Sequence, residues 1–187
     1  MIKKKLVYVG LSADILHEGH INILKIANTL GDVIVGLLTD KAIASYKKIP
    51  HISYKQREIV LKNIKFVSKV IPQKTLDYSD NLNLIKPDYV VHGNDWKSGI
   101  QKETRAKVIK EIKKWGGKLI EPTYTKNISS TLIKKKISEI VSIENRVSML
   151  KRLIHSKNIV RILESHNSLT GLIIENLIIK KKKKDLE

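Results

Sequence analysis

Apolar residues follow two alternating patterns through the first two thirds of the chain. Short continuous apolar runs predict buried strands at residues 6–9, 32–38, 67–71, 88–92 and 118–121. The segments between several of these runs carry apolar residues at helical spacing, most clearly at Ile21, Ile23, Leu24, Ile26, Ala27 and Leu30. Because strands alternate with helices, we predict an α/β fold built on a parallel sheet with right-handed crossovers.

The remaining helices have recognisable boundaries. Ser53 is a good N-cap for a helix over residues 54–64, in which Ile59, Val60 and Ile64 are predicted to be buried. We expect a short helix at 81–86, ending before Pro87, and a longer one at 101–115 that stops at two glycines. Residues 41–52 are predicted to form a loop or a short helix.

Composition narrows the class of protein. The 187 residues allow one good core and a small appendage, and 42% apolar content is ordinary for a globular domain. The chain has no cysteine, which excludes a disulfide framework and a cysteine-rich metal site. The apolar run behind the basic N-terminus is too short for a signal peptide, and no apolar stretch reaches membrane-spanning length. We therefore expect a cytoplasmic protein with no membrane partner.

The chain is strongly basic, with 36 Lys and Arg against 18 Asp and Glu and a formal net charge of +18. Such a charge can indicate nucleic-acid binding. However, the lysines are spread along the chain, aromatic residues make up only 5%, and no nucleic-acid-binding motif is found. We predict no nucleic-acid partner; a basic field would equally favour a nucleotide and a phosphonate.

Two histidines stand where the first strand gives way to its helix. His17 and His20 are three residues apart and share one helix face, with Gly19 between them to admit a ligand close to the backbone. A helix N-terminus favours a phosphate, to which imidazoles can donate hydrogen bonds or, if protonated, supply charge. The pair could instead be a surface pair at a helix start, or two ligands of a zinc site.

Further polar residues follow the second strand. Asp40 ends that strand, so it is expected at the same sheet edge as His17. Lys47 and Lys48 are either solvated side chains or a mobile clamp that neutralises phosphate charge. Arg57 could form a surface salt bridge with Glu58 or Asp80.

Two later motifs carry candidate ligands. In "HGNDW", Asp95 could accept hydrogen bonds from a ribose or a base amine, and Trp96 could stack on a ring or cover the core. His92 is equally suited to a structural role and to a ligand contact. In "ISST", three hydroxyls can cap the following helix or hold a triphosphate, and they are those of Ser129, Ser130 and Thr131.

In chain order, HEGH, TD, YKKIP, SYKQRE, HGNDW and ISST over residues 6–137 resemble the motifs of cytidylyltransferase-type nucleotidyltransferases. That family joins a nucleoside monophosphate to a phosphate or phosphonate and releases pyrophosphate. The resemblance implies a Rossmann-like fold with a five-stranded parallel sheet and helices on both faces, CTP as substrate, Mg²⁺ with the nucleotide, and a homodimer. It implies catalytic roles for His17, His20 and Lys47, with Lys48 as the alternative lysine.

The same resemblance assigns nucleotide binding, including a triphosphate contact by the closing motif and a steadying role for the arginine of SYKQRE. The residues are Gly10, Leu11, Ser12, Asp14, Gly19, Asp40, Arg57, His92, Gly93, Asp95, Trp96, Ile128, Ser129, Ser130 and Thr131. Many family members carry an arginine shortly before the closing motif. Here Lys126 would have to replace it.

The residues within and around these motifs most resemble one branch of the family. In that branch, which belongs to phosphonate biosynthesis, the nucleotidyltransferase domain is fused ahead of phosphoenolpyruvate mutase. The last segment also resembles the start of the mutase barrel at Glu164, His166, Asn167 and Leu169. We therefore predict a nucleotidyltransferase domain at 1–140 and an extension with a basic tail at 141–187. The extension is too short for a barrel, which implies no mutase activity. It is expected to be disordered, helical or buried in a dimer, or else an ordinary amphipathic tail.

The sequence thus favours transfer of CMP from CTP to a phosphonate such as 2-aminoethyl- or 2-hydroxyethylphosphonate. An adenylyltransferase, or a cytidylyltransferase for glycerol phosphate, would keep the fold and change the substrates. A non-catalytic nucleotide-binding or dimerisation remnant of a bifunctional protein is the third alternative.

Overall fold

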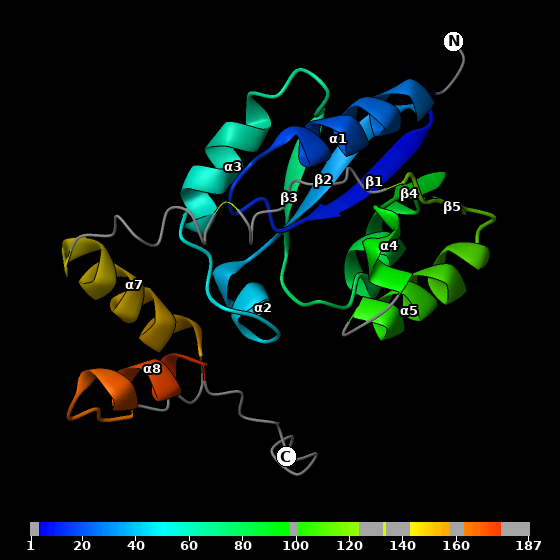
Figure 1. Cartoon of the computed structure of the whole chain (residues 1–187). Helices are drawn as coiled ribbons and strands as arrows, with labels where there is room; N and C mark the ends of the chain where they lie inside the picture. Colours follow the sequence, from blue (N-terminus) through cyan, green and yellow to red (C-terminus); the bar gives the residue numbers. More distant parts are fainter. Residues whose placement is uncertain (1–3, 98–100, 124–132, 134–142, 158–162, 177–187) are drawn as a thin grey trace.

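The computed structural model describes residues 4–97, 101–123, 133, 143–157 and 163–176. Strands and helices alternate along most of this length (Figure 1). The elements are β1 (Leu6–Leu11), α1 (Glu18–Leu30), β2 (Asp32–Leu38), α2 (Asp40–Ala44), α3 (Tyr54–Lys62), β3 (Lys69–Gln73), α4 (Ser79–Ile85), β4 (Tyr89–Val91), the 3₁₀ helix η1 (Asn94–Lys97), α5 (Lys102–Lys113), β5 (Lys118–Ile120), α7 (Ile143–Ser156) and α8 (Ser168–Asn176).

The five strands form one parallel sheet in the order β3-β2-β1-β4-β5. The central strand β1 pairs with β2 over its whole length, from Leu6 opposite Asp32 to Leu11 opposite Leu37, and with β4 at Val7 and Tyr8. The α/β class and the five-stranded parallel sheet predicted from the sequence are therefore confirmed.

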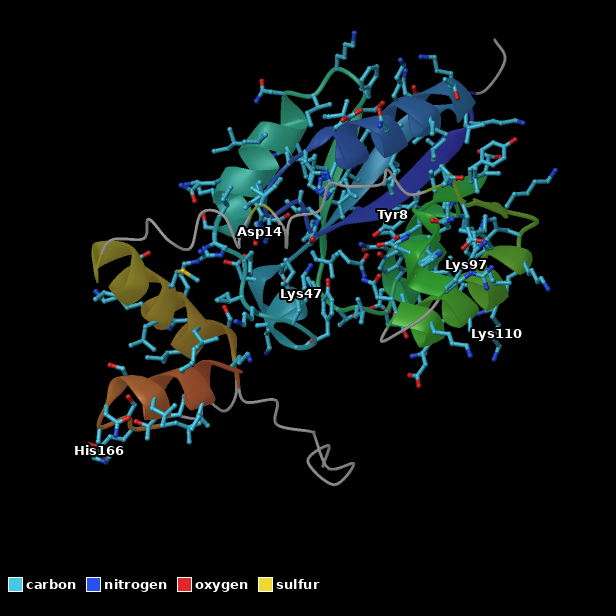
Figure 2. All side chains as sticks on the ribbon, in the orientation of Figure 1. Tyr8, Asp14, Lys47, Lys97, Lys110 and His166 are labelled. Carbon is cyan, nitrogen blue, oxygen red and sulfur yellow. The ribbon has the colours of Figure 1, made fainter. Side chains whose placement is uncertain are left out.

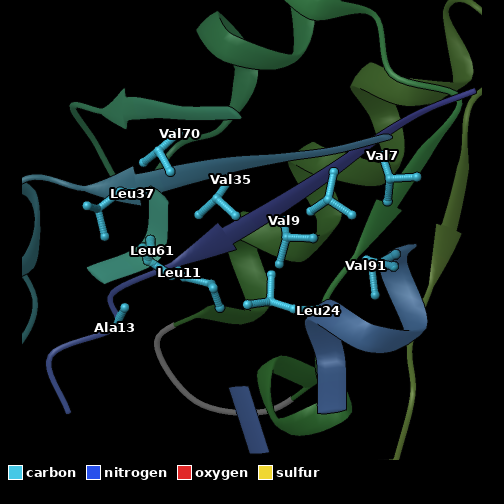
Figure 3. Close-up of a cluster of buried hydrophobic side chains, with 12 residues drawn as sticks. Val7, Val9, Leu11, Ala13, Leu24, Val35, Leu37, Leu61, Val70 and Val91 are labelled. Carbon is cyan, nitrogen blue, oxygen red and sulfur yellow. The ribbon is translucent and has the colours of Figure 1, made fainter. Parts of the chain in front are cut away.

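Helices cover both faces of the sheet, because successive strand residues point to opposite sides. On one face, α1 and α3 pack on Val7, Val9 and their neighbours (Figure 3). The other face contains Tyr8 and Val90 and is covered by α4 and α5. The sheet is thus buried on both sides, which explains why its strands are continuous apolar runs in the sequence.

The orientation of α3 differs from the one predicted. Ser53 is its N-cap, as expected, and its backbone N–H donates to the side chain of Gln56. The buried residues of the helix are Arg57 and Leu61. Ile59 and Val60 are 54% and 49% exposed, so the prediction that they are buried was wrong. The helix turns its i, i+4 face of Arg57 and Leu61 inward because the arginine makes buried hydrogen bonds that the apolar pattern cannot reveal.

Two glycines let tyrosine rings lie directly on the central strands. A Cβ added at Gly36 would lie 1.7 Å from the hydroxyl of Tyr8, and one at Gly10 would lie 2.3 Å from the hydroxyl of Tyr78. The two rings meet edge to face, with centroids 5.8 Å apart. Any larger residue at Gly10 or Gly36 would displace a buried ring.

The described C-terminal residues, 143–157 and 163–176, contain the helices α7 and α8 (Figure 1). This agrees with one of the states expected for the extension, while the domain boundary at residue 140 stays a prediction. Several apolar side chains of α7 are exposed, among them Val147, Leu150 and Ile154. In the described part of the chain, no helix has the length and apolar character needed to cross a membrane.

Candidate active site

A cavity of about 230 Å³ opens at the carboxyl ends of β1 and β4. These neighbouring strands lead the chain in opposite directions across the sheet, to β2 on one side and β5 on the other. Such a switch point is where ligands bind in open α/β sheets. The cavity gathers ten of the predicted residues: Gly10, Leu11, Ser12, His17, Gly19, His20, Lys47, His92, Gly93 and Asp95.

The two histidines of the HEGH motif are fixed by the start of α1. His17 is the N-cap residue, and its Nδ1 accepts the N–H of Gly19 at 3.2 Å. The Nδ1 of His20 accepts the N–H of His17 at 3.3 Å. Because each Nδ1 is an acceptor, the proton of each neutral ring sits on Nε2. Each ring therefore keeps one N–H donor, and both residues line the cavity.

Both imidazoles are neutral at neutral pH. Burial, and then the neighbouring His17 and Lys47, lowers the pKa of His20 to about 4. Burial also lowers the pKa of His17. As neutral rings, the two histidines can donate hydrogen bonds, whereas the positive charge at the cavity belongs to Lys47 and the N-terminus of α1. Among the described residues, no group of three or more potential metal ligands is found around the pair or elsewhere.

The structure separates the two candidate lysines. Residues 41–52 form the short helix α2 followed by a loop, and Lys47 lies in that loop (Figure 2). The Nζ of Lys47 is 3.2 Å from the hydroxyl of Ser12, at the cavity wall. Lys48 is exposed and does not line the cavity. Of the two candidate lysines, Lys47 therefore lies at the cavity.

Arg57 holds the loops around the cavity from within the protein. Its side chain is fully buried and donates to the backbone carbonyls of Ser12, Leu38 and Ile52, and to the carboxylate of Asp40 at 2.7 Å. These partners follow β1, end β2 and precede α3. One guanidinium group therefore joins three segments that are distant in sequence.

The structure corrects the salt bridge that the sequence suggested for Arg57, and it shows Asp14 buried beside the same loops. The ion pair of Arg57 is with Asp40, and not with Glu58 or Asp80 as the alternative supposed. Asp14 is also buried, and its Oδ1 accepts the backbone N–H of Ile52 at 3.1 Å. None of Arg57, Asp14 and Asp40 lines the cavity, so the structure places them where they support the loops.

The turn after β4 forms the opposite wall. His92 lines the cavity, and its ring stacks on Trp96 with centroids 3.9 Å apart and planes at 8°. Trp96 is 1% exposed and belongs to the core beneath α5. Of the two roles considered for Trp96, the structure shows core packing, with His92 covering one ring face. Burial lowers the pKa of His92.

Glu121, which sequence reasoning missed, fixes this turn from the end of β5. Its carboxylate accepts the indole N–H of Trp96 at 2.7 Å and two hydrogen bonds from Arg105, at 2.8 and 3.0 Å. The hydrogen bonds from Arg105, and then that from Trp96, lower the pKa of Glu121 to about 2. No sequence motif marked Glu121, because its partners lie 16 and 25 residues away.

Other cavity residues were also missed. All six carry uncharged side chains, and they are Val9, Ile23, Leu38, Tyr46, Tyr78 and Gln101. Burial raises the pKa of Tyr46 to about 12, and its hydroxyl is hydrogen-bonded to Gln101. In the sequence, the one feature that could have pointed to any of these six residues is that Tyr46 directly precedes Lys47 and Lys48. The closing motif, Ile128 to Thr131, and Lys126 lie outside the described residues, so their roles stay predictions.

The sequence profile of the family "Cytidylyltransferase-like" matches residues 8–136. Glycerol-3-phosphate cytidylyltransferase of Bacillus spizizenii is 38% identical over 96 residues, covering 50% of this chain and 74% of the relative. Ethanolamine-phosphate cytidylyltransferase of Mus musculus is 39% identical over 87 residues, covering 44% of this chain and 21% of the relative.

A solved structure has the same fold. The lipopolysaccharide core biosynthesis protein of Thermoplasma volcanium GSS1 is 26% identical and superposes with a TM-score of 0.57, covering 66% of this chain and 99% of that one. The enzymes named above are cytidylyltransferases for phosphate esters, not mutase fusions. The predicted likeness to the phosphoenolpyruvate mutase branch is therefore not supported by them.

Proposed function

Because the chain belongs to the cytidylyltransferase-like family of nucleotidyltransferases, we propose that it transfers CMP from CTP to a small phosphate monoester and releases pyrophosphate. The observation that carries this proposal is the pair of neutral imidazoles at the start of α1. Both rings present Nε2–H donors, and Lys47 lines the same cavity. This set of donors matches the needs of a triphosphate.

The reaction needs no protein nucleophile. A phosphate oxygen of the acceptor attacks the α-phosphorus of CTP in line, and the bond from that phosphorus to the oxygen bridging to the β-phosphate breaks. His17 and His20 donate hydrogen bonds to triphosphate oxygens, while Lys47 neutralises the charge that builds on the leaving pyrophosphate. The protein contributes position and charge stabilisation, which suffice for phosphoryl-type transfer.

Two further parts of the proposal concern the metal ion and the closing motif. Mg²⁺ is proposed to enter with the nucleotide, since phosphate oxygens and water are its usual ligands, and it would neutralise phosphate charge. Within the described residues, no cluster of three potential protein ligands offers an alternative. Ser129, Ser130 and Thr131 are proposed to hold the β- and γ-phosphates.

The neutral wall of the cavity supports a hydroxylated acceptor. Tyr46, Tyr78 and Gln101 offer hydroxyl and amide groups, which suit the hydroxyls of a polyol phosphate. Among the described lining residues, Asp95 is the one carboxylate that could pair with an ammonium group, and it lies on the β4 side. Because the similar Bacillus enzyme is a glycerol-3-phosphate cytidylyltransferase and the uncharged groups of the cavity suit hydroxyls, a glycerol-phosphate-like acceptor is preferred to 2-aminoethylphosphonate.

The test is a panel that measures pyrophosphate release. CTP and ATP are each incubated with glycerol 3-phosphate, ethanolamine phosphate, 2-aminoethylphosphonate and 2-hydroxyethylphosphonate. We expect the highest turnover with CTP and glycerol 3-phosphate. Higher turnover with either phosphonate would support the mutase-fusion branch instead, and binding of CTP without any turnover would support a non-catalytic remnant.

The histidine assignment is tested in the same assay. His17→Ala and His20→Ala are each expected to lower kcat at least about 100-fold, because each removes a donor to the reacting phosphates. His155→Ala is the matched control, since His155 is an exposed residue of α7. Undiminished turnover in either active-site variant would refute the proposed role of the pair.

A further inference from the structure

Arg152 of α7 contacts both ends of the segment that carries Lys47. Its Nη2 donates to Oδ2 of Asp40 at 2.9 Å, and its Nη1 donates to the backbone carbonyl of His51 at 2.7 Å. Asp40 begins α2, and His51 follows the loop that contains Lys47. A single planar guanidinium therefore closes residues 40–51 at the base, in a fork geometry that lysine cannot reproduce.

The carboxylate of Asp40 is shared by two arginines from different parts of the chain. Oδ1 accepts from Arg57, which is buried in the nucleotidyltransferase domain, and Oδ2 accepts from Arg152 of the extension. The side chains of Asp40 and Arg152 are 19% and 21% exposed, so the pair is largely shielded from solvent. A shielded, charge-assisted hydrogen bond holds its geometry better than an exposed one.

The loop between these anchor points needs such support. Lys47 is exposed, and its Nζ approaches the cavity at Ser12 from the loop after α2. A lysine that must meet a developing charge acts only if its backbone is already in place, because ordering the loop during the reaction would cost conformational entropy. Arg57 fixes the base of this loop from the inside, and Arg152 fixes it from the outside.

We propose that Arg152 is a positioning residue through which the C-terminal extension holds the Lys47 loop in its active geometry. The extension would then be a working part of the catalytic site and not a passive appendage. The catalytic half of this inference rests on the proposed function, whereas the ordering of the loop does not. The two halves can therefore be tested separately.

The loop is tested with the full-length chain by limited trypsin digestion and mass spectrometry. In Arg152→Ala, initial cleavage after Lys47 and Lys48 is expected to rise about tenfold, in line with losing hydrogen bonds to a charged group. Arg152→Lys should give an intermediate rise, because one ammonium group cannot serve both acceptors in the same geometry. Lys151→Ala, at an exposed neighbour on the same helix, should leave cleavage in the loop unchanged.

Turnover is measured on the same variants. Arg152→Ala should lower kcat about tenfold while the KM for CTP changes less than about twofold, and Arg152→Lys should recover part of kcat. In an Asp40→Asn background, Arg152→Ala should have little further effect on loop cleavage, since the two residues act as one unit.

Several results would overturn the inference. If Arg152→Ala opens α7 to trypsin but leaves cleavage after Lys47 and Lys48 at the Lys151→Ala level, Arg152 only docks the helix. Unchanged kcat with increased loop cleavage would show that loop order does not limit the reaction. If the wild-type chain turns over no acceptor, the proposed function fails, while the digestion still decides whether Arg152 orders the loop.

Discussion

Replacing Glu121 by glutamine should destabilise the protein strongly, because the structure makes its carboxylate the centre of a hydrogen-bonded cluster. Its side chain is 14% exposed and accepts from Arg105 and from the indole of Trp96. The amide of glutamine keeps one acceptor and turns the other into a donor that faces the guanidinium of Arg105. Trp96 supports the ring of His92 in the cavity wall, so the nucleotide site should weaken as well.

The magnitude follows from the pKa of Glu121, which falls from an ordinary 4.5 to about 2. A pKa lowered this far corresponds to roughly 3 kcal/mol of stability at neutral pH. Because the pKa is depressed in the folded state, this stabilisation is complete above about pH 4.5 and disappears as the pH falls towards 2. At about pH 3.5, roughly 2 kcal/mol should remain.

The assay is urea denaturation of the wild type and Glu121→Gln at neutral pH and at several values down to about pH 3. Glu103→Gln is the control, since Glu103 is exposed on the same helix as Arg105. We expect Glu121→Gln to lose about 2–3 kcal/mol at neutral pH, with the difference from wild type narrowing in acid. A loss no larger than that of the control, or a difference independent of pH, would refute the reasoning.

Three other outcomes are expected. Lys47→Ala should lower kcat at least about 100-fold, whereas Lys48→Ala should stay within about threefold of wild type; equal losses would contradict the placement of Lys47. Gly10→Ala should cost about 1–3 kcal/mol in urea denaturation and weaken CTP binding measured by calorimetry, because the added methyl meets Tyr78 at the cavity floor. Since the pKa of His20 is lowered to about 4, the unfolded chain takes up its proton first, so stability should fall as the pH drops from 6.5 towards 4. His20→Gln should flatten that part of a stability-against-pH curve, and an unchanged slope would contradict a neutral, buried His20.

Local patterns were enough to predict the strands and most of the helices, and together with the family resemblance they named ten of the residues that line the cavity. The run of residues 32–38 was predicted with the bounds that the structure has, because a strand buried on both faces is a continuous apolar run. His17 and His20 lie at the start of the helix that follows β1, and Asp95 lies in the turn after β4, so all three come after the carboxyl ends of neighbouring parallel strands. Their proximity therefore follows from chain order alone.

The partners of the charged residues could not be predicted in this way. These contacts are set by how distant elements pack. Arg57 pairs with Asp40, and Arg105 pairs with Glu121. Arg152 contacts His51 and Asp40, which lie 101 and 112 residues earlier in the chain. The exposure of Ile59 and Val60 has the same origin, because the helix face that turns inward depends on what a buried arginine can bond. Periodicity records only which residues are neighbours along a strand or a helix, whereas these contacts join segments that meet only after the sheet has formed.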